Sequence, residues 1–284
     1  MKTKSYSFEF FPPKTPESAE KLRATRIKLA SLKPAYFSVT FGAGGSTQVG
    51  TLETVTEIQQ SGLSAAPHMS CIGSSRGELK ALLDTYMSRG INRIVSLRGD
   101  MPSGMGVGST GEFRHANELV QFIREATGKH FHIEVAAYPE VHPQAESASA
   151  DLKHFKAKIL AGADSALTQY FYNPDAYFRF VDNCAKMGVH APIVPGIMPI
   201  TNYKQLARFS DGCGAEIPRW LRKQLEDFGD DIESLKAFGL DVTTKLCRTL
   251  LDGGAPGIHF YTMNQAEPTM QIWRDLNLSP QQIE

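Results

Sequence analysis

Short apolar runs rich in β-branched and aromatic residues alternate along the chain with longer segments whose apolar positions recur at helical spacing. This alternation predicts parallel strands that are joined by helical crossovers. The expected strands are Tyr6–Phe11, Tyr36–Phe41, Ala65–Cys71, Arg93–Leu97, Ile133–Tyr138, Ala166–Phe171, Ile193–Ile197 and Ile258–Tyr261. Eight such strands predict an α/β fold, a closed (β/α)8 TIM barrel.

Amphipathic segments lie between most pairs of these strands, and several end at a glycine suited to a helix C-cap. The expected helices include Glu17–Leu32, Glu78–Arg89, Asn117–Thr127 and Ala150–Ala161. A long segment separates the seventh strand from the eighth, so extra helices are expected there, at Asn202–Asp211, Pro218–Phe228 and Asp231–Leu251. Because no linker, low-complexity tract or composition shift interrupts the chain, we expect a single domain over residues 1–284.

A doubly wound open sheet is the competing architecture, and it would carry a glycine fingerprint directly after its first strand. That turn is Phe11-Pro12-Pro13-Lys14 in this chain. A G-x-G-x-x-G string does occur at Gly106, Gly108 and Gly111, but it follows the fourth strand. We therefore interpret it as a loop and not as a dinucleotide site.

Composition and charge narrow the kinds of partner. Lys plus Arg and Asp plus Glu both number 30, so no charge excess favours nucleic acid or an anionic membrane. The four cysteines are far apart, which favours a reducing compartment. We expect no signal peptide, because Glu9 and Pro12-Pro13 interrupt the apolar stretch near the N-terminus, and no apolar stretch reaches the about 20 residues of a membrane span. These features predict a soluble, cytoplasmic protein that acts on small molecules.

Polar residues gather where the expected strands end, which is where barrels of this class carry their active sites. They are Glu9, Thr40, His68, Arg98, Asp100, Tyr138, His142, Gln169 and Tyr261. A single such residue is commonly a satisfied core polar group, but so many at one rim predict an active site. His68, Glu140 and His142 lack the tight spacing of metal ligands, so no metal is expected.

Glu9 lies among Phe8, Phe10 and Phe11, and burial in apolar surroundings opposes ionisation of a carboxyl group. A Glu9 that remains protonated near neutral pH would be a candidate general acid. The alternative is that strand alternation points Glu9 outward into solvent.

Asp100 closes the tripeptide Arg98-Gly99-Asp100, where glycine permits a planar ligand to approach the backbone. An ionised Asp100 would stabilise a cation, and its alternative interpretation is a turn or N-cap residue. Asp151 and Lys158 are seven residues apart and share a helix face, which suits either a phosphate-bearing ligand or a solvated surface.

The sequence resembles the methylenetetrahydrofolate reductases in a series of words that run in family order along essentially the whole chain. These words are Ser7-Phe8-Glu9-Phe10-Phe11-Pro12-Pro13, Ser38-Val39-Thr40, Ala66-Pro67-His68, Leu97-Arg98-Gly99-Asp100, Ala136 to Pro143, Thr168-Gln169, Pro195-Gly196-Ile197 and His259-Phe260-Tyr261-Thr262. The resemblance implies a flavin-binding barrel with FAD as cofactor and NADH or NADPH as hydride donor. It also implies ping-pong reduction of 5,10-methylenetetrahydrofolate to 5-methyltetrahydrofolate in one pocket.

The resemblance also implies roles for individual residues. Glu9 matches the acid that protonates N5 of the folate, and Asp100 matches a carboxylate near the flavin and pterin that favours a cationic iminium ion. Folate contacts are implied for Gln169, Phe209, Tyr261 and Gln265. Cofactor contacts are implied for Thr40, His68, Leu97, Arg98, Gly99, Asp100, His115, Ala116, Ala136, Tyr138, His142, Asp151 and Lys158.

The chain departs from relatives at several of these positions. Gln265 stands where relatives often carry arginine, which removes a charge-assisted contact to the folate glutamate tail. His154 and Ala157 replace polar or basic flavin contacts, and His115 replaces an aromatic hydroxyl. Family analogy further implies a homo-oligomer, specifically a tetramer. The rival functions are a flavin-free barrel lyase or pterin-binding methyltransferase, and a catalytically inactive barrel that serves as a binding module.

Overall fold

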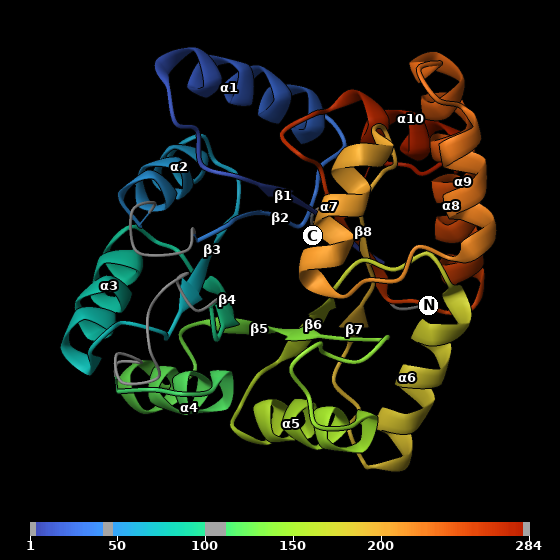
Figure 1. The fold of residues 1–284 in the computed structure, drawn as a ribbon. Coiled ribbons are helices and arrows are strands. Elements are labelled where there is room, and N and C mark those ends of the chain that lie inside the picture. The colour runs from blue at the N-terminus through green and yellow to red at the C-terminus, as the bar shows by residue number, and fades with distance from the viewer. Residues whose placement is uncertain (1–3, 42–47, 100–111, 281–284) are drawn as a thin grey trace.

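The computed structural model describes residues 4–41, 48–99 and 112–280, and its parallel strands form a barrel inside a ring of helices (Figure 1). The strands are β1 (Ser5–Phe10), β2 (Tyr36–Val39), β3 (Ala65–Ser70), β4 (Arg93–Leu97), β5 (His132–Ala137), β6 (Ser165–Thr168), β7 (Ile193–Val194), β8 (Gly196–Ile197) and β9 (Gly257–Tyr261). All of the predicted strands are present, and the predicted barrel is confirmed.

The seventh predicted strand is divided by Pro195, which has no amide hydrogen to donate to a neighbour. Its first half, β7, pairs with β6, and its second half, β8, pairs with β9. The Pro195 carbonyl accepts a hydrogen bond from the His259 amide at 3.0 Å. This short segment therefore joins the two ends of the sheet, whose order is β7-β6-β5-β4-β3-β2-β1-β9-β8.

Helices follow nearly every strand and cover the outside of the barrel (Figure 1). They are α1 (Pro16–Ala30), α2 (Gln48–Gln60), α3 (Arg76–Ser88), α4 (Ala116–Thr127), α5 (Ala148–Leu160), α6 (Pro174–Lys186), α7 (Tyr203–Cys213), α8 (Arg219–Asp227), α9 (Ile232–Asp252) and α10 (Glu267–Asp275). Helices α7, α8 and α9 lie between β8 and β9, where extra helices are expected. Helix α10, after the last strand, is not anticipated by the sequence pattern.

Alternation along β1 separates an apolar outer face from a polar inner face. Phe8 packs against Phe37 and Trp273 in the layer between strands and helices. Ser7 and Glu9 point the other way, into the barrel, and Glu9 is only 8% exposed. The outward, solvent-facing orientation of Glu9 is therefore wrong.

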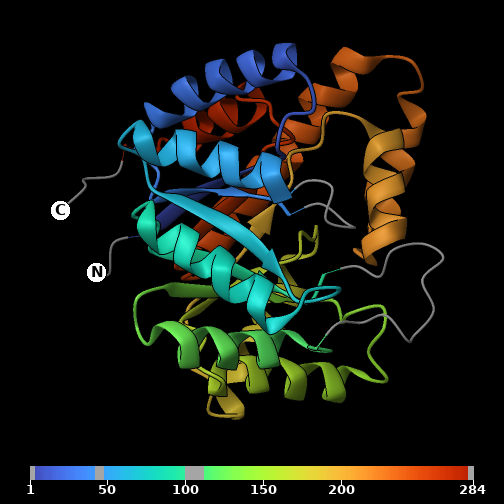
Figure 2. The same ribbon diagram turned by 90° about the vertical axis from the view of Figure 1, so that its left-hand side faces the viewer.

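The carboxyl ends of the strands share one rim of the barrel, as parallel pairing requires. Helix α7 stands at that side of the molecule and away from the chain termini (Figure 2). The predicted loop with Gly106, Gly108 and Gly111 lies outside the described residues, as does Asp100. Among the helices described, none is long and apolar enough to cross a membrane.

Candidate active site

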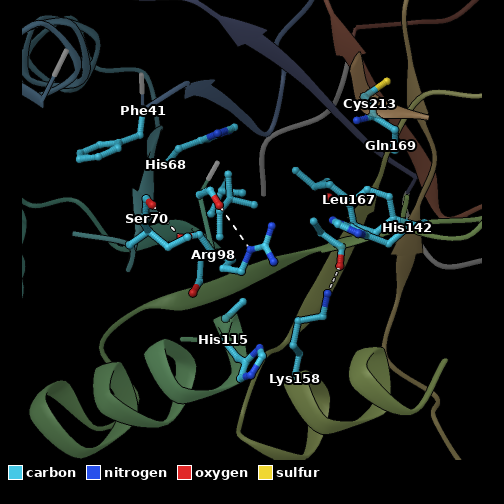
Figure 3. A pocket seen from close by; sticks show the side chains of 18 of the residues that line it. Phe41, His68, Ser70, Arg98, His115, His142, Lys158, Leu167, Gln169 and Cys213 are labelled. Carbon is cyan, nitrogen blue, oxygen red and sulfur yellow. Dashed lines mark hydrogen bonds between the residues drawn. The ribbon is translucent and has the colours of Figure 1, made fainter. Parts of the chain in front are cut away.

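A cavity of about 1770 Å³ opens at the carboxyl ends of the strands (Figure 3). Fifteen of the predicted site residues contribute to its wall. They are Glu9, His68, Leu97, Arg98, Gly99, His115, Ala116, Ala136, Tyr138, His142, Asp151, Lys158, Gln169, Phe209 and Tyr261. His154 and Ala157, the two departures from relatives on helix α5, line the same cavity.

Three predicted site residues are not placed in the cavity wall. Asp100 lies outside the described residues. The Thr40 carbonyl accepts a hydrogen bond from the Thr51 hydroxyl at 2.7 Å, and Thr40 does not line the cavity. Gln265 is exposed in the turn before α10 and does not line it either. The roles that the resemblance implies for these residues stay predictions.

Two histidines surround the Glu9 carboxylate. His68 Nε2 lies 3.2 Å from Glu9 Oε2, at ion-pair distance but without the alignment of a hydrogen bond. His259 Nε2 lies 3.4 Å from the same oxygen, and the Ser38 hydroxyl lies 3.5 Å from it. Burial alone raises the pKa of Glu9, but His68 and His259 outweigh burial and lower the pKa to about 2.

The expectation of a resting, protonated Glu9 is therefore wrong. Phe8 and Phe10, next to Glu9 in sequence, point away from its carboxylate: both pack against Phe37, and Phe8 also packs against Trp273 of α10. The groups that face Glu9 are imidazoles from β3 and β9. The lowered pKa favours the ionised form of Glu9 in the resting site.

His259 was missed as a member of this cluster, although it belongs to a word shared with the family. Its side chain is completely buried inside the barrel. The signal was available from alternation, because His259 and Tyr261 are two residues apart on β9 and point to the same face. Phe41, Ser70, Arg208 and Cys213 also line the cavity and were not singled out.

The end of β4 presents backbone to the cavity in a fixed geometry. Gly99 has a φ of 89°, a region that side-chain-bearing residues rarely adopt. A Cβ at Gly99 would lie 1.9 Å from the Ser70 hydroxyl oxygen, and that hydroxyl donates to the Arg98 carbonyl at 2.8 Å. Glycine is thus required here, and it leaves a flat backbone surface beside the Arg98 side chain.

Cationic and imidazole groups line the wall formed by β5, α5 and the start of α4 (Figure 3). Lys158 points from α5 into the cavity and donates to the Ala136 carbonyl at 2.5 Å. Burial lowers the pKa of Lys158 to about 8, and Asp151 acts in the opposite direction. The Asp151 carboxylate accepts a hydrogen bond from the His142 amide at 2.9 Å, which fixes this loop.

The opposite wall of the cavity carries aromatic side chains and the side-chain amide of Gln169. The Tyr261 hydroxyl donates to the Thr168 carbonyl at 2.7 Å, which places its ring beside Gln169 at the end of β6. Phe209 on α7 faces the same space. Nowhere in residues 4–41, 48–99 and 112–280 do three His, Cys, Asp or Glu side chains gather as a metal site would need.

Structural comparison supports the barrel fold. A Clostridium thermocellum protein whose structure binds two copies of 5-methyl-5,6,7,8-tetrahydrofolic acid aligns with a TM-score of 0.69 at 14% identity. The alignment covers 97% of this chain and 95% of that one. An oxaloacetate acetylhydrolase aligns with a TM-score of 0.52 at 10% identity, covering 96% of this chain and 80% of that one. At such low identity these similarities concern the fold alone.

Sequence comparison reaches further. Residues 1–277 match the family described as methylenetetrahydrofolate reductase. The 5,10-methylenetetrahydrofolate reductase of Escherichia coli is 40% identical over 275 residues, which covers 96% of this chain and 91% of the relative. The Arabidopsis thaliana methylenetetrahydrofolate reductase (NADH) 1 is 38% identical, over 96% of this chain and 48% of the longer plant protein. This chain therefore belongs to the methylenetetrahydrofolate reductase family of oxidoreductases.

Proposed function

We propose that this protein uses bound FAD and NADH or NADPH to reduce 5,10-methylenetetrahydrofolate to 5-methyltetrahydrofolate by a ping-pong mechanism. The observation that carries the proposal is a single cavity with Glu9 and His68 on one side and the half-buried Lys158 on the other. One such cavity suits two substrates that bind in turn against the same cofactor. The names of the bacterial and plant relatives support the reaction and NADH as donor.

The residues present fit FAD. The cavity exceeds the roughly 300–1,000 Å³ of a usual small-molecule site, so it has room for a dinucleotide and a second ligand. Lys158 and Arg98 would hold the phosphates, because a half-buried ammonium gains stability from an anionic partner. The glycine backbone at Gly99 would lie against the flavin ring. When bound, FAD supplies hydride transfer between the nicotinamide and the folate.

Glu9 would deliver the proton that accompanies the hydride. Opening of the five-membered ring releases an amine nitrogen, and a proton at that stage prevents a nitrogen anion from forming. Gln169, Tyr261 and Phe209 would orient the folate above Glu9. Asp100 is proposed to stabilise the cationic intermediate, as the resemblance implies, and Gln265 is proposed to contact the folate tail without a charge.

The proposal is tested by anaerobic mixing of the purified protein with NADH or NADPH, followed by methylenetetrahydrofolate. Bound flavin is expected to lose its absorbance in the first step and to regain it in the second. Absence of flavin in the protein, together with no bleaching after reconstitution with FAD, would contradict the proposal. The flavin-free lyase or methyltransferase would then be preferred, although only the fold supports it.

A Glu9→Gln variant separates the two half-reactions. We expect flavin reduction by NADH to remain within about twofold of wild type, whereas folate reduction falls by about 10²-fold or more, as for loss of a general acid. Glu233→Gln, on the exposed surface of α9, is the matched control. An equal loss of both half-reactions in Glu9→Gln would refute the assignment of Glu9 as proton donor.

We further propose that the protein is cytoplasmic, that residues 1–284 form a single domain, and that the protein assembles into a homotetramer. Light scattering of the purified protein measures the assembly.

A further inference from the structure

The turn after β5 connects two walls of the cavity. We call residues 138–143 the β5 turn. Within it, Tyr138 and His142 line the cavity, and their rings meet edge to face with centroids 4.5 Å apart. Glu140 lies between them in sequence but does not line the cavity. Its side chain instead reaches the segment that follows helix α7, the helix that carries Phe209.

Glu140 holds that segment through a backbone hydrogen bond. The Glu216 amide donates to Glu140 Oε2 at 2.8 Å. Glu140 Oε1 is also buried, and it has no hydrogen-bond partner among the described residues. Burial raises the pKa of Glu140, whereas the hydrogen bond from the Glu216 amide lowers it. Desolvation of this carboxyl group costs free energy, and in the described structure the contact with the Glu216 amide offsets it.

A second contact joins the β5 turn to the C-terminal end of α7. Gly214 follows α7 with a φ of 74°, and its amide donates to the Ser210 carbonyl at 2.8 Å. A Cβ at Gly214 would lie 2.4 Å from Pro143 Cγ. Glycine is therefore required both for the left-handed backbone and for the close approach of Pro143. The end of α7 thus meets the β5 turn at two points, Glu140 and Pro143.

The β5 turn is strained at its centre. Val141 has a φ of 74°, which a β-branched residue rarely adopts, and its amide donates to the Tyr138 carbonyl at 3.3 Å. Strain of this kind persists only where the surrounding contacts enforce it. On one side of Val141 the contact is the hydrogen bond to Glu140, and on the other the His142 amide donates to Asp151 at 2.9 Å. The strained residue thus directs Glu140 to α7 and His142 to the cavity.

Helix α7 forms a wall of the cavity with side chains that face the same space as His142 (Figure 3). Phe209 and Cys213 are among them. In the middle of α7, Ser210 Oγ lies 3.0 Å from the Tyr170 hydroxyl, which follows β6. The contacts with the β5 turn add a fixed point at the C-terminal end of the helix, close to Phe209 in sequence.

We infer that Glu140 is a positioning residue that holds α7 against the β5 turn, so that Phe209 contacts the folate while Tyr138 and His142 contact the flavin. Glu140 acts through the backbone of Glu216 and touches neither ligand. This inference rests on the proposed function, because it assigns the folate to the α7 wall and the flavin to the opposite one.

Hydrogen–deuterium exchange of the purified protein tests the inference without catalysis. In Glu140→Ala the amides in the last turn of α7 should exchange about tenfold faster than in wild type, whereas those of α6 should not change. Glu140→Gln should keep the wild-type rate, because its side-chain carbonyl accepts from the Glu216 amide. Glu146→Ala is the matched control, since Glu146 is exposed in the same loop. Unchanged exchange of α7 in Glu140→Ala would overturn the inference.

Kinetics of the same variants show whether the position of α7 matters for the folate. In Glu140→Ala the KM for methylenetetrahydrofolate is expected to rise about tenfold while kcat falls less than about threefold, as for a loss of binding. Glu140→Gln should restore KM to within about twofold of wild type. A merely structural role would lower the amount of active protein, which reduces kcat and leaves KM unchanged. That result would also overturn the inference.

A second variant displaces α7 without changing Glu140. Gly214→Ala places a methyl group against Pro143 and should raise KM as Glu140→Ala does. Gly188→Ala is the matched control. Gly188 follows α6 with a φ of 76°, but a Cβ there would meet no described atom within 4 Å. Both variants carry the same kind of backbone strain, so equal KM values would contradict the inference.

Exchange and kinetics together separate the inference from the proposed function. If the wild-type protein does not reduce methylenetetrahydrofolate, the proposed function fails, while the exchange of α7 still measures whether Glu140 holds the helix. If the protein is active and Glu140→Ala changes neither the exchange of α7 nor the KM for the folate, the inference alone fails.

Discussion

With a pKa of about 8, the side chain of Lys158 exchanges a proton close to neutral pH. Burial is the cause, and a bound phosphate would restore the charged form. Binding of FAD to apoprotein at pH 9 should therefore take up a proton, and affinity should fall as the pH rises above 8. Calorimetry in two buffers of different ionisation enthalpy measures this uptake.

The uptake should disappear in Lys158→Met. Lys156→Met is the control, because Lys156 lies on the same helix but donates to the Met187 carbonyl. Equal proton uptake in both variants would show that another group interacts with the phosphates.

At the residue scale the sequence predicted identities better than ionisation states. Glu9 and Lys158 were selected from strand ends and helix spacing, and both line the cavity. The pKa of Glu9 depends on His68 and His259, which are far from it in sequence. A carboxyl group is desolvated by whatever faces it, and its sequence neighbours on a strand face elsewhere.

Among the elements, α9 packs close to the segment that follows β8. A Cβ at Gly239 in the middle of α9 would lie 2.3 Å from the Ile200 carbonyl oxygen. Gly239→Ala should lower the free energy of unfolding by about 1–3 kcal/mol, as an overpacked core does. Urea denaturation of the wild type and the variant measures this difference in the free energy of unfolding.

A glycine-to-alanine substitution in α3 is expected to have the opposite effect on the free energy of unfolding. A Cβ at Gly77 meets only the Ser75 hydroxyl at 4.0 Å, so Gly77→Ala should stabilise the protein by about 0.5–1 kcal/mol through helix propensity. Stabilisation by both variants would contradict the close packing described at Gly239.

Elements were predicted from periodicity wherever a buried face made it strong. The strands are apolar on the face that meets the helices, which is why all were found. Pro195 divides one of them because hydrogen bonding, and not apolarity, defines where a strand stops. Helix α10 is short, and Pro268 near its start resembles a loop signal, although proline suits the first turn of a helix.

For the molecule as a whole, the low pKa of Glu9 makes the free energy of unfolding depend on pH in the acid range. A carboxyl group whose pKa is lower in the folded state contributes stability above its unfolded value, near 4.5. That contribution should be lost as the pH falls toward 2. Acid titration of the free energy of unfolding should show a smaller slope in this range for Glu9→Gln than for Glu233→Gln. Identical slopes would mean that Glu9 is not ionised in the folded protein.

The rim site was predictable at this scale because parallel strands bring their carboxyl ends together. The buried hydrogen bonds inside the barrel were not. Ser7 and His259 are 252 residues apart in sequence, and Tyr36 and Glu134 are 98 apart. Such contacts depend on strand register inside the closed barrel, which no local pattern specifies.

Residues 193–197 form the junction that closes the barrel. Two residues before Pro195 pair with β6, and two residues after it pair with β9. Local opening of a native protein is easiest where the fewest backbone hydrogen bonds have to break. Amide hydrogens of this segment should therefore exchange with solvent faster than those of β1 or β4. The Tyr261 hydroxyl and the Gly196 amide both form hydrogen bonds to Thr168, so Tyr261 is connected to this junction. A folate that contacts Tyr261 should therefore slow amide exchange at the junction. Binding of a ligand at the rim would then be detected as slower amide hydrogen exchange at this junction, without a change in the helices.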